Sequence, residues 1–413
     1  MVWAMARSTM TMATGGKIAE HLSIGVLAQI YPWATLTSAL KQTGRESERV
    51  RDLPAEVVTY YVMSLGLFMA VSTREVLRVL VEGLQWMGAA GQPQPLRVAS
   101  KAAISQARTR LGVAPLKRLW EQTAQPLAQP QAAGAFYRGL RLMAIDGTTL
   151  DVPDTQANVG RFGKPGASRG KAAFPQVRLV GLVETGAHAM LAVAMAPYKT
   201  GEHTLAKEVV PKLSAGMLCL ADRLFASFSL WQLAVNTGAE LLWRVRANYR
   251  LPVETVLADG SYLSTFYAST ADRRHRKNGA RVRVIEYTLA NHPKGETYRL
   301  MTTLLDADQA PASELAALYP ERWEMEGVFD ELKTHLRGGQ QVVLRSKTPD
   351  LVEQEIYGLL LAHRAVRSLL CRAAHCEKID PDRLSFTHTV RVLRRKLAHP
   401  PVFSPSARGD LAS

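Results

Sequence analysis

Two short apolar runs that each end in an aspartate constrain this chain most. Residues 140–145 (LRLMAI) precede Asp146, and residues 217–221 (MLCLA) precede Asp222. Each run has the length and composition of a buried strand. Further strands are expected over 177–183, 189–195 and 240–246, with helices over 201–213 and 227–235. This alternation predicts an α/β sheet with helices on its faces, and such sheets place chemistry at the carboxyl ends of strands.

Residues 318–336 (LYPERWEMEGVFDELKTHL) have the composition of a helix with a polar face. At about 100° per residue, a sector about 60° wide holds four of its side chains, those of Tyr319, Arg322, Glu326 and Lys333. Taken alone, this face is an ordinary solvated surface with an Arg322–Glu326 pair at i,i+4. The two upstream aspartates change that interpretation, because Glu326 becomes a third carboxylate beside two cations and an aromatic ring.

Three such carboxylates predict a site for two Mg²⁺ or Mn²⁺ ions, which prefer oxygen ligands. Two ions can activate an attacking oxygen and stabilise the leaving oxygen of a phosphodiester. Two alternatives stay open. Asp330 falls on the same helix face as Glu326, so periodicity does not exclude it as the third ligand. Asp151 competes with Asp146, because it lies in the segment expected to turn back after the first strand.

Residues 1–133 show the apolar spacing of helices. Within them, residues 100–112 are a candidate DNA recognition helix, since Ser100 can cap it and Gly112 can end it. Its side chains suit contacts to phosphates and base edges, although an ordinary amphipathic surface helix is the alternative. The expected polar and basic face consists of Lys101, Ser105, Gln106, Arg108 and Arg110, and the predicted DNA contacts are Lys101, Gln106 and Arg108.

Residues 247–305 interrupt the strand–helix rhythm with a polar, β-rich stretch. It carries a group of cations that is either a solvated loop or a further DNA contact. Residues 158–173 form a glycine-rich basic loop that lacks the spacing of a Walker motif. The cationic group consists of Arg273, Arg274, Arg276, Lys277, Arg281 and Arg283.

The formal net charge of +15 and the pI near 9.8 favour a polyanionic partner, most commonly nucleic acid.

The longest uncharged apolar run, 57–71, is shorter than the roughly 20 residues that a membrane-spanning helix needs. The amino terminus lacks the layout of a signal peptide, so a cytoplasmic, nucleoid-associated protein is expected. Three cysteines exclude a disulfide framework, and Cys371, His375 and Cys376 lack the spacing of a zinc finger.

These residues resemble a known family, the DDE transposases of bacterial insertion sequences, in the insertion-sequence-four-like subgroup with a Tyr-Arg-Glu-Lys signature. The signature Y-x2-R-x3-E-x6-K matches at the four helix residues named above. Asp146 in AIDGTTLDVPDT and Asp222 in LADRLFAS resemble the family's two aspartates. Residues 344–367 resemble its C-terminal helices, and the helical amino-terminal region resembles its N-terminal domain.

The resemblance implies a ribonuclease-H-like catalytic core interrupted by a β-rich insertion. The core would comprise residues 134–246 and 306–345, with the insertion at 247–305. A helical DNA-binding domain at 1–133 would precede the core, and a helical region at 346–413 would follow it. The implied catalytic residues and metal ligands are Asp146, Asp222 and Glu326, and the implied contacts to the terminal DNA strand are Tyr319, Arg322 and Lys333.

The implied activity is transposition. The protein would bind the terminal inverted repeats of its own element, cleave the ends and join the 3′-OH groups to target DNA, as a homodimer or larger synaptic complex. A metal-dependent endonuclease and a non-catalytic DNA-binding regulator are the alternatives. Some relatives seal the excised end as a hairpin with the help of a tryptophan in the insertion. Residues 247–305 contain no tryptophan, so no residue is assigned to that step.

Overall fold

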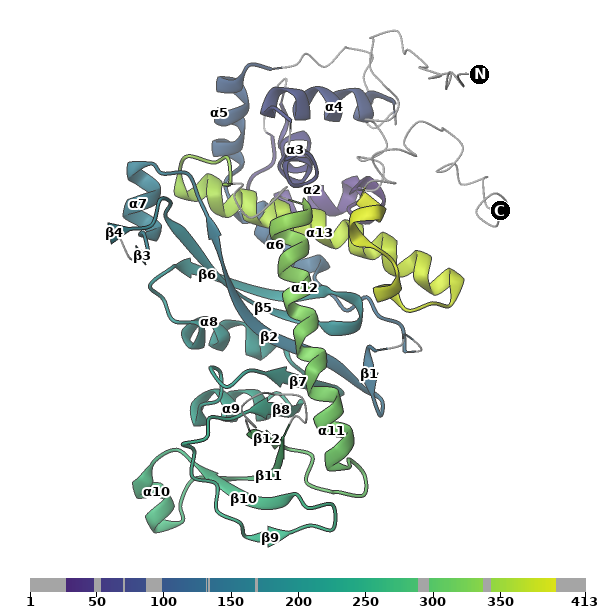
Figure 1. The fold of residues 1–413 in the computed structure, drawn as a ribbon. Coiled ribbons are helices and arrows are strands. Elements are labelled where there is room, and N and C mark those ends of the chain that lie inside the picture. Colours follow the sequence, from purple (N-terminus) through teal and green to yellow (C-terminus); the bar gives the residue numbers. More distant parts are fainter. Residues whose placement is uncertain are drawn as a thin grey trace, which may run out of the picture. The chain divides into compact units, whose positions relative to one another are not determined.

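The structure is a computed structural model (Figure 1). It describes residues 27–47, 53–69, 71–86, 99–130, 132, 134–167, 170–288, 297–336 and 343–390, with the side chains of 81–86 and 382 left aside. Contacts group the chain into two compact units. The first comprises Met1–Thr123, Asp330–Ala373 and Leu384–Ser413, and the second comprises Ala124–Phe329 and Ala374–Arg383. Each unit is described by itself below.

In its described residues the first unit is helical, as the apolar spacing predicts. Its amino-terminal part contains α2 (Trp33–Gln42), α3 (Ala55–Leu67), α4 (Thr73–Trp86), α5 (Lys101–Leu111) and α6 (Ala114–Thr123). Its later part contains the π-helical turn η4 (Glu331–Leu336) and most of the long helix α13 (Pro349–Glu377). None of the helices in the described part of the chain is long and apolar enough to cross a membrane.

Helices α3 and α13 approach closely because glycines lie at their crossing. A Cβ on Gly358 would lie 2.5 Å from the carbonyl oxygen of Val62, and one on Gly66 would lie 3.1 Å from Leu359 Cα. The hydroxyl of Tyr31 donates a hydrogen bond to the carbonyl of Leu361 at 2.9 Å. The predicted apolar segment 57–71 therefore forms a buried helix only over its first part, because α3 ends at Leu67 and Val71 is exposed.

The second unit is built on one large sheet of order β6-β5-β2-β7-β8-β12-β11-β10-β9. Strands β6, β5 and β2 run antiparallel, whereas β2, β7 and β8 are parallel. This is the strand order of a ribonuclease-H-like core, so the predicted fold class is confirmed. The strands of this core are β2 (Leu140–Asp151), β5 (Gln176–Glu184), β6 (Ala189–Pro197), β7 (Met217–Ala221) and β8 (Glu240–Arg244).

Helices cover both faces of the core sheet. On one face lie α8 (Glu202–Val209) and α9 (Phe228–Val235), and the segment from α11 (Ala312–Leu318) to α12 (Glu324–Asp330) crosses the other (Figure 1). Apolar residues of the sheet pack against α11, among them Leu220 and Leu242 against Leu315. On the other face, Trp231 of α9 meets Trp243 of β8 edge-on, with ring centroids 5.3 Å apart.

The β-rich insertion continues this sheet, because β12 pairs with β8. Its strands are β9 (Thr255–Val256), β10 (Tyr262–Tyr267), β11 (Gly279–Thr288) and β12 (Thr297–Thr302), with the short helix α10 (Thr270–His275) between β10 and β11. The four-part domain division stays a prediction. The compact units begin the core at Ala124 and hold the insertion together with it.

One member of the predicted cationic group is structural. Arg283 is fully buried. It donates hydrogen bonds to Ser261 Oγ at 2.8 Å and to the carbonyl of Ala310 at 2.6 Å, and it pairs with Asp259. The prediction of a solvated or DNA-contacting Arg283 is therefore wrong, since residues 282–285 of β11 are all buried and the guanidinium bonds to acceptors inside the unit. Arg274, Arg276, Lys277 and Arg281 are exposed.

Two predicted elements differ in detail. The first acid-ended strand does not turn back after Asp146, because β2 continues to Asp151 by pairing with β5. The helix predicted over 318–336 changes geometry along its length. Between α11 and α12 lies a 3₁₀ segment, η3 (Tyr319–Trp323), and α12 is followed by the π-helical η4.

Candidate active site

The register between β2 and β7 brings the two predicted aspartates side by side. The parallel pairing runs from Arg141↔Met217 to Ile145↔Ala221. Asp146 and Asp222 directly follow the last paired residues of β2 and β7, so they lie side by side where the two strands separate. A strand can deliver a carboxylate to this position because the apolar run before it is fully buried, as Ile145 and Ala221 are.

Asp146 is held by an arginine of the signature. Arg322 Nη1 donates a hydrogen bond to Asp146 Oδ2 at 3.0 Å. Desolvation raises the pKa of Asp146, and the nearby charge of Asp222 adds to the rise. The backbone N–H of Gly147, 2.7 Å from Oδ1, and the Arg322 guanidinium act against it. The two aspartates therefore share one electrostatic environment.

The 3₁₀ geometry of η3 explains why Tyr319 and Arg322 act together. Side chains three residues apart eclipse in a 3₁₀ helix, so both point at the sheet. Their exposed fractions are 4% and 5%. The Tyr319 hydroxyl donates a hydrogen bond to the carbonyl of Ala221 at 3.2 Å, directly before Asp222. Each of these two signature residues thus contacts one of the two acid-bearing chain segments, at or directly before its aspartate.

The neighbours of Glu326 anchor α12 beside Asp146. Gly181 pairs with Asp146 across β5 and β2, and a Cβ on Gly181 would lie 3.1 Å from Met325 Cε. On the far side of Glu326, Gly327 lies against His188, whose Nε2 is 2.7 Å from Glu324 Oε2. Glu326 itself is exposed, and its carboxylate makes no hydrogen bond or ion pair with a described residue. The helix is fixed while this carboxylate stays accessible.

The two competing aspartates have other neighbours. Asp330 is exposed and belongs to the first unit, where its Oδ2 lies 3.1 Å from His335 Nε2. Asp151 lies five residues beyond Asp146 on β2, which places it on the opposite face of the strand, and it accepts a hydrogen bond from Gln176 at 2.8 Å. Lys333, half-buried on η4, also belongs to the first unit.

Sequence reasoning missed a further carboxylate and an aromatic residue near these acids. Glu202, the first residue of α8, pairs with Arg178 on β5. Burial raises the pKa of Glu202, Arg178 opposes the rise, and the nearby charges of Asp146 and Asp222 add to it. Trp323 is 55% exposed next to Arg322, whose guanidinium carbon is 4.7 Å from the centroid of the indole. The signature spacing gave no signal for Glu202, which only the fold brings to this edge.

The predicted recognition helix forms as α5, with Ser100 as its cap accepting from Ala103 N at 3.2 Å. Lys101 and Gln106 are exposed. Arg108 is 6% exposed and hydrogen-bonds to Gln354, to Ser346 and to the carbonyl of Leu351. Arg108 therefore ties α5 to α13, and the prediction that it faces DNA is wrong, since it shares the inner face of α5.

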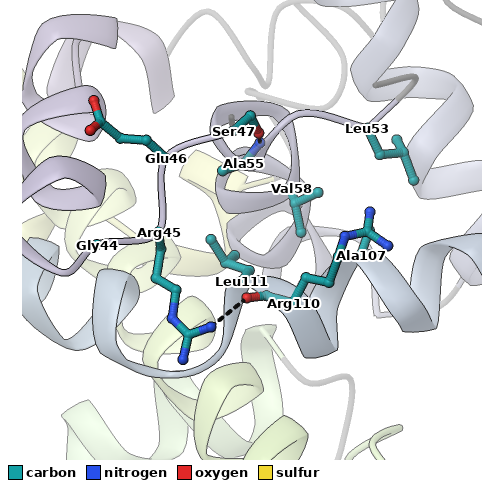
Figure 2. Close-up of a pocket in the computed structure, with 10 residues that line it drawn as sticks. All are labelled: Gly44, Arg45, Glu46, Ser47, Leu53, Ala55, Val58, Ala107, Arg110 and Leu111. Atoms are coloured by element: carbon teal, nitrogen blue, oxygen red, sulfur yellow. Dashed lines mark hydrogen bonds between the residues drawn. The ribbon is translucent and has the colours of Figure 1, made fainter. Parts of the chain in front are cut away.

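A hollow of about 310 Å³ lies between α5 and the loop after α2. Two arginines, Arg45 and Arg110, lie at its edge, and Figure 2 shows the Arg45 guanidinium turned toward the carbonyl of Arg110, to which Nη1 donates at 3.1 Å. Both side chains are exposed. The exposed side of α5 thus keeps a cationic surface even though Arg108 is buried.

We expect opposite results from two substitutions in α5. Arg108→Ala should lower the free energy of unfolding by about 3 kcal/mol, because buried polar partners lose a charged donor. Lys101→Ala should change stability by less than about 0.5 kcal/mol. It should instead weaken DNA binding and reduce the salt dependence by about one counterion. Chemical denaturation and salt-dependent binding of duplex DNA measure the two effects, and equal destabilisation by both would contradict this assignment.

The side chains at the sheet edge fit a hard divalent ion by their chemistry, since carboxylate oxygens are the preferred ligands of Mg²⁺ and Mn²⁺. The missing side chain at Gly147 also leaves room beside Asp146, which the carboxyl group of Glu202 fills. Within the described ranges, no three His, Cys, Asp or Glu side chains are grouped so as to hold an ion as they stand. The guanidinium of Arg322 already bonds to Asp146, so an ion that binds Asp146 would have to compete with Arg322.

Comparisons with known proteins identify the family of this chain. Residues 21–121 match a family model described as the insertion element 4 transposase N-terminal domain, and residues 137–364 match a transposase DDE domain. The chain is therefore a DDE-type DNA transposase, an enzyme of DNA cleavage and strand transfer. More narrowly, it belongs to the IS4 family of these transposases. DDE transposases use divalent metal ions.

Two curated relatives come from Escherichia coli (strain K12). The transposase InsG for insertion sequence element IS4 is 30% identical over 388 residues, which cover 92% of this chain and 85% of InsG. The putative transposase InsZ is 29% identical over 226 residues, which cover 54% of this chain and 72% of InsZ. A solved structure of the piggyBac transposase synaptic complex with hairpin DNA is 13% identical at a TM-score of 0.44, covering 95% of this chain and 82% of that one.

Proposed function

We propose that this transposase binds the terminal inverted repeats of its own insertion sequence, cleaves the DNA at the element ends and joins the 3′-OH ends to target DNA. The observation that carries the proposal is the register of β2 and β7, which places Asp146 and Asp222 directly after the last paired residues, Ile145 and Ala221. From η3, directly before the helix that carries Glu326, Arg322 contacts Asp146 and Tyr319 contacts the carbonyl of Ala221.

Asp146, Asp222 and Glu326 are the proposed ligands of two Mg²⁺ or Mn²⁺ ions. When bound, two such ions activate an attacking oxygen and stabilise the leaving oxygen of a phosphodiester. Arg322 keeps Asp146 oriented, and the carboxylate of Glu326 is accessible for joining the site. No side chain has to act as a covalent nucleophile.

Contacts to DNA are proposed on both units. Tyr319, Arg322 and Lys333 are the proposed contacts to the terminal strand, although Tyr319 and Arg322 must give up part of their contacts with the sheet to reach it. Lys101 and Gln106, with Arg45 and Arg110 beside them, are proposed to hold duplex DNA through phosphates. Arg108 is not among these contacts, because it is buried. The net charge of +15 supports a DNA partner. We further propose a homodimer or larger synaptic complex in the cytoplasm, associated with the nucleoid.

The test uses duplexes that carry the element's ends, a supercoiled target plasmid and Mg²⁺. We expect end cleavage and covalently joined products, and we expect both to disappear when EDTA removes the metal and to return with added Mg²⁺. Cleavage without joined products would instead identify a metal-dependent endonuclease. Binding that is indifferent to EDTA, with no cleavage at any Mg²⁺ or Mn²⁺ concentration, would identify a DNA-binding regulator.

A further inference from the structure

Glu202 lies against the backbone next to Asp146 without belonging to the signature. A Cβ on Gly147 would lie 2.5 Å from Glu202 Cδ, so the carboxyl group occupies the space that a side chain at 147 would need. Gly147 follows Asp146 directly and faces the opposite side of β2. Glu202 therefore approaches the aspartates from the face of the sheet that carries α8.

An arginine on the same face fixes this position. Arg178 Nη1 donates a hydrogen bond to Glu202 Oε1 at 2.8 Å, and Arg178 Nε donates one to the carbonyl of Tyr198 at 3.0 Å. The side chains of Arg178 and Glu202 are only 25% and 22% exposed. The second oxygen of Glu202, Oε2, makes no hydrogen bond with a described residue. One oxygen is thus held while the other stays available.

The charges at this edge of the sheet do not balance. Three carboxylates at this edge are accompanied by two guanidinium groups, those of Arg178 and Arg322, which leaves one negative charge in excess before Glu326 is counted. Like charges at this proximity are unfavourable unless a cation joins them.

We propose that Glu202 is a fourth carboxylate of the metal site and contributes to divalent-ion affinity from the α8 face. The inference rests on the proposed function, because it assumes that the ions bind at Asp146 and Asp222. If Glu202 only formed an ion pair with Arg178, the repulsion between its carboxylate and the two aspartates would be an uncompensated cost. Bound to the same ion, the three carboxylates attract a common charge instead of repelling one another.

The test measures Mn²⁺ binding to the full-length protein without DNA, by electron paramagnetic resonance of the free ion. Glu202→Gln keeps the hydrogen bond to Arg178 but removes the charge, and we expect it to raise the Kd for Mn²⁺ by about tenfold or more. Glu208→Gln is the matched control, since Glu208 is exposed on the same helix, and we expect it to bind as the wild type does. An unchanged Kd for folded Glu202→Gln overturns the inference.

A second variant keeps the inference testable if Glu202→Gln does not fold. Gly147→Ala places a methyl group where the flexible end of Glu202 now lies, so the carboxyl group must move away, and Mn²⁺ binding should weaken in the same way. Wild-type affinity in that variant then overturns the inference.

Asp222→Asn distinguishes failure of the whole metal site from failure of the role of Glu202 alone. If it also binds Mn²⁺ normally, the proposed metal site itself fails, whereas normal binding by the Glu202 and Gly147 variants alone removes only Glu202.

Discussion

Asp222→Asn is expected to reduce strand cleavage by about a thousand-fold, equivalent to about 4 kcal/mol of transition-state stabilisation, while binding of end DNA is retained. Asparagine has nearly the same volume, and the described contacts of the Asp222 carboxylate are limited to the backbone N–H of Arg223 at 2.5 Å. Asp146 is a less informative choice, because its replacement leaves the buried Arg322 without its partner. The measurement is single-turnover cleavage of end DNA in Mg²⁺, with binding followed separately.

The third ligand is decided by the same assay. Glu326→Gln should match Asp222→Asn, and Asp330→Asn should cleave as the wild type does. Both side chains are exposed on one helical segment, so neither substitution disturbs the core. Normal cleavage by Glu326→Gln together with a loss in Asp330→Asn would transfer the role to Asp330. Normal cleavage by Asp222→Asn would contradict the proposed site as a whole.

The strands that precede Asp146 and Asp222 can be predicted from the sequence, because a short apolar run and the charged residue after it are neighbours in the chain. A run such as 217–221 is buried on both faces, and the first charged residue after it has to leave the sheet. Two parallel strands with such ends meet at one edge, which gives Asp146 and Asp222 without knowledge of the tertiary structure. The insertion was likewise visible from 247–305, where the alternation of strand and helix stops.

The burial of the signature residues could not be predicted from helical periodicity. An ideal α-helix turns Tyr319, Arg322 and Glu326 to one side, but η3 tightens before α12 begins, so the first two are buried and Glu326 is exposed. The prediction that Arg108 faces DNA is wrong for a related reason, because its partners Ser346 and Gln354 lie far away in sequence. A basic residue on a helix can face DNA or a buried acceptor, and only long-range packing decides between them.

Glu331→Ala is expected to lower the free energy of unfolding by about 3–5 kcal/mol. Glu331 is 5% exposed on η4, with His363 Nε2 2.7 Å from its Oε2 and Arg367 Nε donating to the same oxygen at 2.8 Å. Removal of the carboxylate leaves the buried guanidinium of Arg367 without its counter-charge, which is costlier than the loss of the pair's own attraction. The measurement is chemical denaturation of the full-length protein.

Glu121→Ala is the matched control in the same unit. Glu121 pairs with Arg118 at 3.8 Å on the surface of α6, where an ion pair contributes at most about 1 kcal/mol. Equal stabilities of the two variants would contradict the buried network. A π-helical turn is rare and is frequently found at functional sites, and η4 also carries Lys333. The network of Glu331 with His363 and Arg367 is therefore what we expect to hold Lys333 in a turn that the local sequence alone would form as α-helix.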